Sequence, residues 1–156
     1  MATRSTIAMK TPEGKVRAIY CHWDGYIDHN GKILIGNYTD PAKIKALIDL
    51  GDLSILKPEV GDKHTFDRYS EEPELTAMFD NWTLAYHRDR DENWVDVAPQ
   101  TFDHIGDWVQ GFDMGVEFFY LWDGQDWLVH KHYDTDYNGF PVFEYVEVGI
   151  LKEIVI

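Results

Sequence analysis

The sequence predicts an α+β fold: an antiparallel sheet of about five to seven strands, built from hairpins, with two or three helices packed on it. Three observations favour this class. Two pairs of β-favouring runs flank short turns rich in Pro, Gly or Asp, which is typical of hairpins. Two other segments carry helix-start signals or apolar residues at helical spacing. Strictly alternating strand and helix units, which a doubly wound sheet requires, are absent from the sequence.

The first hairpin is predicted over residues 5–23. Its strands are residues 5–11 and 16–23, with a Pro/Gly turn between them. Successive strand residues point to opposite faces, so Cys21 and His22 cannot form a catalytic dyad with each other. Cys21 shares its face with apolar neighbours and is therefore expected to be a buried structural cysteine.

The following segment contains one clear helix. Asp40 and Pro41 form a strong helix start, apolar residues follow at helical spacing, and Gly51 is a suitable end. Residues 31–38 are compatible with either a short helix or a strand. Residues 52–80 are irregular and contain an acidic patch, so we expect a long loop there.

Residues 82–97 are predicted to form a strand, a charged turn and a second strand. The strand covers residues 82–87, the turn 88–92, and residues 94–97 pair back. A second helix is expected over about 102–116, because apolar residues repeat there at spacings of three and four.

The second clear hairpin joins residues 118–122 to residues 127–133 through a turn of Asp, Gly and Gln. A further strand is expected over residues 142–150. The apolar residues 154–156 at the end of the sequence are expected to pack into the sheet.

Composition and charge exclude several classes of protein. The 156 residues are expected to form one domain, residues 1–156, and the single cysteine excludes an internal disulfide. The net charge is −14, but residues 1–60 hold 8 basic and 7 acidic residues, whereas residues 61–156 hold 6 and 21. Without a basic footprint, direct binding to nucleic acid or to anionic lipid is not expected. No apolar run suits a membrane span or a secretion signal, so we expect a cytoplasmic protein.

Two short segments supply the candidate binding residues. The strand end at residues 22–26 combines aromatic and charged side chains, as recognition surfaces do, and His22 would share a face with Asp24 if the strand continued. The charged residues 88–92 form either a recognition tip or a solvated turn with local ion pairs. The candidates are His22, Trp23, Asp24, Tyr26, Arg88, Asp89, Arg90, Asp91 and Glu92.

Two patterns suggest metal binding but favour simpler interpretations. His130 and His132 lie on one strand face and would need a third ligand, such as His87 or Asp134. The apolar residues of that strand occupy the other face, so exposed polar histidines are the expectation. Asp134, Asp136 and Asn138 copy half of a calcium loop, but the position of the bidentate Glu is Tyr145. A polar hairpin turn accounts for them better, and we expect no metal or other cofactor.

The sequence lacks the common catalytic and phosphate-binding motifs. The abundant carboxylates allow a different interpretation, because carboxylates displayed along a surface can imitate the phosphates of a duplex. Ordinary acidic solubility is the alternative. The acidic residues considered are Glu71, Glu72, Glu74, Asp80, Asp89, Asp91, Glu92, Asp96, Asp103, Asp107, Asp113 and Glu117.

Several stretches carry a resemblance to known proteins: Met1 to Ala8, Ile19 to Tyr26, Tyr38 to Asp40, Leu50 to Ser54 and the arginine pair in Arg88 to Arg90. Over residues 1–61 the chain resembles a family of small uncharacterised proteins encoded by bacteriophages and mobile elements. In that family a glycine follows the arginine pair, where this chain has Asp91. The resemblance implies an accessory protein that modulates a host system, but it brings no established activity.

These observations lead to three hypotheses. The first is a non-enzymatic phage accessory protein that binds a host protein and inhibits a defence system, such as restriction, CRISPR or nucleotide signalling; its partner would be a basic, nucleic-acid-binding enzyme. The second is a protein that sequesters a small molecule such as a nucleotide, with phosphates held by Arg4, Arg17, Arg88 and Arg90. The third is a small hydrolase that depends on His22 and Asp24 or on a metal.

Overall fold

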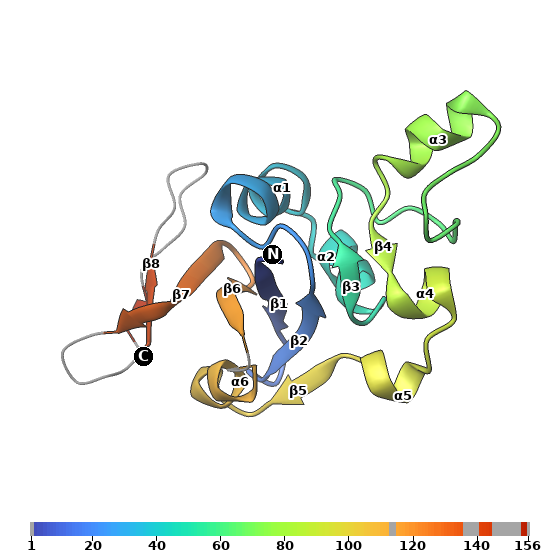
Figure 1. The fold of residues 1–156 in the computed structure, drawn as a ribbon. Helices are drawn as coiled ribbons and strands as arrows, with labels where there is room; N and C mark the ends of the chain where they lie inside the picture. Colours follow the sequence, from blue (N-terminus) through green and yellow to red (C-terminus); the bar gives the residue numbers. More distant parts are fainter. Residues whose placement is uncertain (1, 113–114, 136–140, 145–153, 156) are drawn as a thin grey trace.

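The α+β class is confirmed by the structure, a computed structural model that describes residues 2–112, 115–135, 141–144 and 154–155 (Figure 1). In this part of the chain nine strands form one sheet in the order β4-β3-β2-β1-β6-β7-β8-β9, and β5 pairs with the free part of β2. The strands are β1 (Arg4–Lys10), β2 (Val16–Cys21), β3 (Leu53–Ile55), β4 (Leu84–Ala85), β5 (Gln100–Phe102), β6 (Val116–Trp122), β7 (Trp127–Thr135), β8 (Pro141–Glu144) and β9 (Ile154–Val155). The number exceeds the predicted one because four strands have only two or three residues.

The helices of the described chain are short. They are the π-helical turn η1 (Ile27–Gly31), α1 (Lys32–Asn37), α2 (Pro41–Ile48), α3 (Pro73–Phe79), α4 (Tyr86–Arg90), α5 (Trp94–Val97) and α6 (Ile105–Gly111). The start of α2 is as predicted, because Pro41 opens it and the Asp40 side chain accepts a hydrogen bond from the Ala42 backbone N–H at 2.9 Å.

Both predicted hairpins are present, as β1–β2 and β6–β7. The sheet is mixed, however, and not purely antiparallel. Strand β1 runs parallel to β6, and β2 runs parallel to β3. A parallel pair needs a crossover connection. The segment with η1, α1 and α2 makes that connection between β2 and β3. Because β3 pairs with β2 and β6 pairs with β1, the first hairpin lies in the interior of the sheet.

The expected strand–turn–strand over residues 82–97 is wrong. Only Leu84–Ala85 is a strand, followed by α4 and α5. Side chains explain the difference, since Asp89 accepts a hydrogen bond from the Ala85 backbone N–H at 2.8 Å and Asn93 caps α5 through the Val95 N–H. The helix expected over 102–116 is also shorter, because the preceding residues pair with β2 as β5.

Helices cover both faces of the sheet. On one face, η1, α1 and α2 bury Ile7, Ile19 and Cys21 of the first hairpin. On the other, α6 packs on Ala8, Ala18 and strand β6. Figure 1 shows α1 and α2 on the side of the sheet opposite to α6. With both faces buried, alternation along a strand no longer separates buried from exposed positions.

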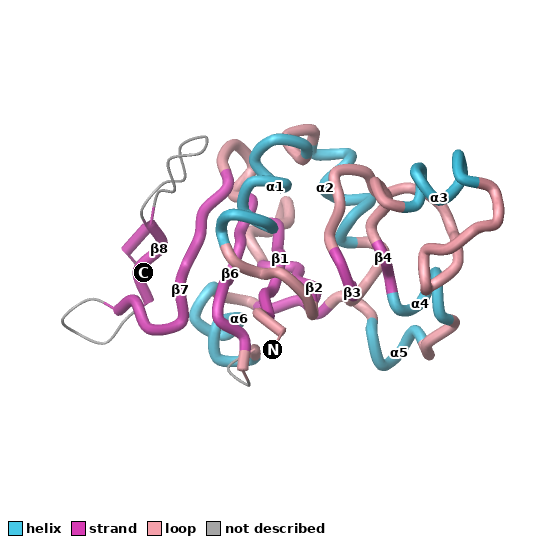
Figure 2. Tube along the Cα trace, turned by 45° about the horizontal axis from the view of Figure 1, so that its top comes forward, coloured by secondary structure: helices cyan, strands magenta, loops and turns pink. Residues whose placement is uncertain are grey.

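Residues 65–81, which we call the α3 arm, stand apart from this body. Figures 1 and 2 show α3 beyond β4, at the edge of the molecule. None of the residues of α3 is buried. The expected long loop is therefore an arm with a helix at its outer part, while residues 53–55 belong to the sheet as β3.

Candidate functional site

The predicted recognition turn at residues 22–26 is held rigidly at the end of β2. The backbone N–H groups of His22 and Trp23 donate to Leu53 and Ser54, at 3.0 Å each. Asp24 then takes a left-handed conformation with φ 56°, and Gly25 packs so tightly that a Cβ would lie 2.7 Å from that of Ser5. The turn fixes its two aromatic residues in partly exposed positions, with Trp23 42% and Tyr26 41% exposed.

The His22 side chain is hydrogen-bonded to a residue of the same strand. Its Nδ1 lies 2.7 Å from the hydroxyl of Tyr20, on the same strand face. Burial, followed by the positive charge of Arg4, lowers the pKa of His22, which favours the neutral ring. The strand ends before Asp24, and no hydrogen bond or ion pair of the described chain joins Asp24 to His22. The structure therefore does not bring these two residues together as an acid–base pair.

Cys21 is a buried structural cysteine, as expected. It has no exposed surface, and burial raises the pKa of its thiol to about 11. The Asn30 side-chain amide donates to its sulfur at 3.5 Å and to the Ser5 hydroxyl at 3.1 Å. The thiol serves the packing beneath the turn and is not a nucleophile at neutral pH.

The predicted charged tip at residues 88–92 divides into an inner and an outer part. Arg88 points inward: its guanidinium donates to the carbonyl groups of Val60, Gly61 and Thr83 at 2.7–3.0 Å. Its Nε also pairs with the carboxylate of Asp89 at 3.0 Å, and the side chain of Asp89 is fully buried. These two residues connect the 60–64 loop to α4, so they are not available to a partner.

The outer residues of this segment remain at the surface. Arg90 lies over the rings of Phe66 and Tyr86 and pairs with Glu92 at 2.6 Å. Asp91, with φ 58°, pairs with Lys63 at 3.4 Å. All three thus make local contacts, as a solvated turn with ion pairs would.

Sequence reasoning missed Asp52, which connects β2 to the start of α4. Its carboxylate accepts a hydrogen bond from the Tyr20 N–H at 2.9 Å, and its backbone carbonyl accepts one from the Tyr86 N–H at 3.2 Å. Burial raises the pKa of Asp52 to about 6. A single aspartate directly after a glycine carries no sequence signal for such a position, because the burial arises from strands far apart in the sequence.

The expectation of two exposed histidines on β7 is wrong for His130. It is 1% exposed, and its ring lies 5.5 Å from that of Phe119 on the face that α6 covers. His132 and Asp134 belong to β7, whereas Asp136 and Asn138 lie outside the described residues. Among the residues that the structure describes, no three His, Cys, Asp or Glu side chains gather as metal ligands do.

Several exposed acidic side chains gather on the α3 arm. Its residues 65–81 include five acidic residues and one arginine. Glu71, Glu72 and Glu74 are exposed, and so are Tyr69 (63%) and Met78 (46%). Of the other acidic residues considered for mimicry, Asp89 is buried, and Asp113 lies outside the described residues.

The base of the arm is anchored by aromatic rings. His64 is buried, its ring stacks on Phe79 with centroids 5.1 Å apart, and it meets Trp82 edge-on at 5.4 Å. The His64 backbone N–H donates to Asp89 at 3.2 Å, so the inner part of the charged segment also supports the arm. The arm therefore has a fixed base and an acidic outer part that carries exposed aromatic and thioether side chains.

Comparison with known proteins gives no relative. No family model, no curated protein and no solved structure matches the chain. In the described part of the chain, none of the helices has the length and apolar character needed to cross a membrane.

Proposed function

We propose that this protein is a non-enzymatic accessory protein that binds and modulates a host protein, and that the α3 arm is its principal contact surface. The observation that carries the proposal is the arm itself. It stands beyond the sheet edge, buries none of its helix residues, and presents three exposed glutamates with Tyr69 and Met78. Exposed apolar residues bordered by charge are typical of protein interaction sites.

The chemistry of the arm indicates a basic partner. Five carboxylates against one arginine attract a cationic surface, and such attraction mainly increases the rate of encounter. A host enzyme that binds nucleic acid has such a surface, because it must neutralise phosphates. Tyr69 and Met78 would add apolar contact once the charges have met. The resemblance to phage-encoded proteins supports a defence enzyme as the partner class.

The test is affinity capture from a bacterial host lysate with three proteins. One is the wild type. The second carries Glu71→Lys, Glu72→Lys and Glu74→Lys. The third is a charge-matched control with the exposed residues Glu13, Asp96 and Glu117 changed to Lys, none of which lies on the arm. Thermal melting checks that all three fold.

We expect the wild type and the control to capture the same proteins at about 0.1 M salt and the arm variant to lose them. Capture by the wild type should fall strongly at about 0.5 M salt, where screening shortens the reach of charges. Equal capture by the arm variant would place the contact elsewhere. Capture that is insensitive to salt would contradict docking through carboxylates.

A further inference from the structure

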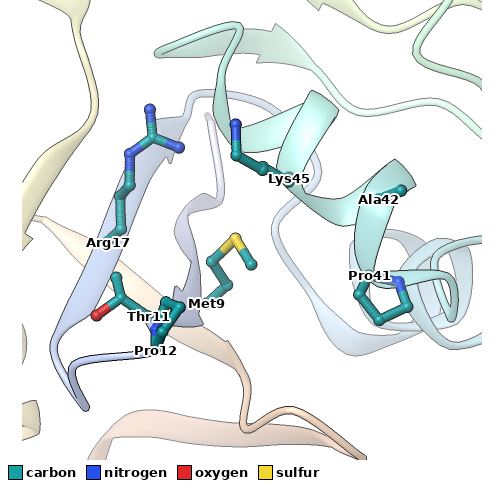
Figure 3. Close-up of a pocket in the computed structure, with 7 residues that line it drawn as sticks. All are labelled: Met9, Thr11, Pro12, Arg17, Pro41, Ala42 and Lys45. Carbon is teal, nitrogen blue, oxygen red and sulfur yellow. The ribbon is translucent and has the colours of Figure 1, made fainter.

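A hollow of about 350 Å³ lies between the β1–β2 hairpin and the start of α2 (Figure 3). Its apolar walls are Met9, Pro12, Pro41 and Ala42, and the charged side chains at its rim are Arg17 and Lys45. A second hollow of about 410 Å³ shares Met9, Thr11, Pro12 and Pro41 with it and extends to Trp122, with Lys10 and Asp123 also in its lining. Each hollow has the size of a small-molecule site.

The two cations at the rim share a single carboxylate. Arg17 Nη1 lies 2.6 Å from one oxygen of Asp49, and Lys45 Nζ lies 2.7 Å from the other. One negative charge between two positive ones leaves this edge with a net positive charge. Within the described residues the remaining donors of Arg17 make no hydrogen bond, so its planar guanidinium can still bind a second anionic group.

The start of α2 does not provide the anion site. Asp40 caps this helix: its carboxylate accepts the Ala42 N–H, and Pro41 has no N–H to offer. The attraction therefore comes from the side chains of Arg17 and Lys45. It lies within residues 1–60, where basic residues outnumber acidic ones by one, unlike the rest of the chain.

The walls select for an apolar body. In the first hollow Met9, Pro12, Pro41 and Ala42 offer no side-chain hydrogen-bonding group, and the uncharged polar side chain is that of Thr11, whose hydroxyl accepts the Lys15 N–H. A nucleotide base has several polar edge atoms, and these walls offer few groups to replace its hydrogen bonds with water. An aliphatic chain has no hydrogen bonds with water to lose, and burying its methylene groups is favourable.

We propose that these joined hollows bind an aliphatic monocarboxylate, with its carboxylate on the remaining donors of Arg17, near Lys45, and its chain along Met9, Pro12 and Pro41 toward Trp122. This site is separate from the α3 arm, and either proposal can fail without the other.

The test is calorimetric titration of the full chain with octanoate, compared with acetate and octan-1-ol. Octanoate has both parts of the ligand, acetate has only the charge, and octan-1-ol has only the chain. We expect octanoate to bind more tightly than either of the others. Absence of octanoate binding, or equal binding of octan-1-ol, would overturn the proposal.

Two pairs of variants locate the site. Ala42→Phe fills the hollow, whereas Ala46→Phe adds the same bulk at an exposed position of α2 that does not line it. Lys45→Gln removes a rim cation, and Lys32→Gln removes a comparable exposed lysine that also pairs four residues away. We expect octanoate affinity to fall at least about tenfold for Ala42→Phe and about threefold for Lys45→Gln, with little change in the controls. Unchanged affinity in Ala42→Phe would exclude this hollow.

Discussion

In the wild type, ionisation of Asp52 is expected to lower the free energy of unfolding as the pH rises. Replacing Asp52 with Asn should abolish this decrease. The Asp52 carboxyl group is largely buried beside the backbone of β2, and burial raises its pKa from the ordinary 3.8 to about 6. Between these two values the folded protein holds a proton that the unfolded chain has released. Folding stability therefore decreases as the pH rises through this interval.

The size of the effect follows from the two pKa values. Each pKa unit corresponds to 1.36 kcal/mol, so the ionised carboxylate costs the folded state about 3 kcal/mol once the pH is above both values. About half of this cost develops between about pH 5 and pH 7.5, where the Asp52 carboxylate ionises in the folded protein. Asn keeps the oxygen that accepts the Tyr20 N–H but cannot ionise, so the variant escapes the cost.

The assay is urea unfolding of both proteins across this pH range, followed by tryptophan fluorescence. The free energy of unfolding of Asp52→Asn, minus that of the wild type, should rise by about 1.5 kcal/mol from about pH 5 to pH 7.5. Effects of the other carboxylates cancel in this difference. A constant offset would reflect packing, so only the change with pH tests the reasoning.

Asp49→Asn is the control. Burial acts on Asp49 too, but the hydrogen bonds from Lys45 and Arg17 outweigh it and lower the pKa of Asp49 below the ordinary value. Asp49 is then ionised in both states throughout the same pH range, and its difference curve should be flat. A flat curve for Asp52→Asn as well would refute the burial argument.

Two further predictions concern residues that the structure places inside. Cys21 should react with a thiol reagent only as fast as the protein unfolds, because its thiol is buried and burial raises the pKa of the thiol to about 11. Labelling is followed by absorbance, and rapid labelling of the native protein would contradict this prediction. Arg88→Ala should lower the free energy of unfolding in urea by about 3–5 kcal/mol, because it leaves Asp89 and three carbonyl groups without their cation. Arg90→Ala, which loses ring contacts and an exposed ion pair, should cost about 1 kcal/mol and serves as the comparison.

Local features of the fold could be predicted, and long-range ones could not. Both hairpins and the start of α2 depend on residues close in sequence, and their signals are strong. The parallel pairing of β1 with β6 depends on residues more than a hundred positions apart, and no local pattern specifies it. His130 shows the consequence. Residues 127–130 of β7 alternate between the two faces as predicted, but the face expected to be solvated is covered by α6.

Long-range contacts also decide which of the predicted binding residues are exposed. A sequence shows that residues 88–92 are charged, but it does not show which charges find buried partners. Arg88 and Asp89 do, because the 60–64 loop offers two carbonyl groups to Arg88 and a backbone N–H to Asp89. Trp23 and Tyr26 stay exposed because the turn before η1 holds them outside both cores. The acidic patch at residues 71–74 was visible in the sequence, whereas its position on an arm was not.

The distribution of charge determines how the two proposed sites act. Attraction between exposed charges falls off within about 8 Å at physiological ionic strength. The overall charge of −14 therefore governs solubility and encounter, whereas binding at each site depends on its immediate neighbours. On the arm those neighbours are five carboxylates and one arginine, and at the rim of the hollow they are two cations and one carboxylate. An acidic chain can thus attract a basic protein at one place and bind a carboxylate at another, and rising salt should weaken capture by the arm far more than the binding of a largely apolar ligand.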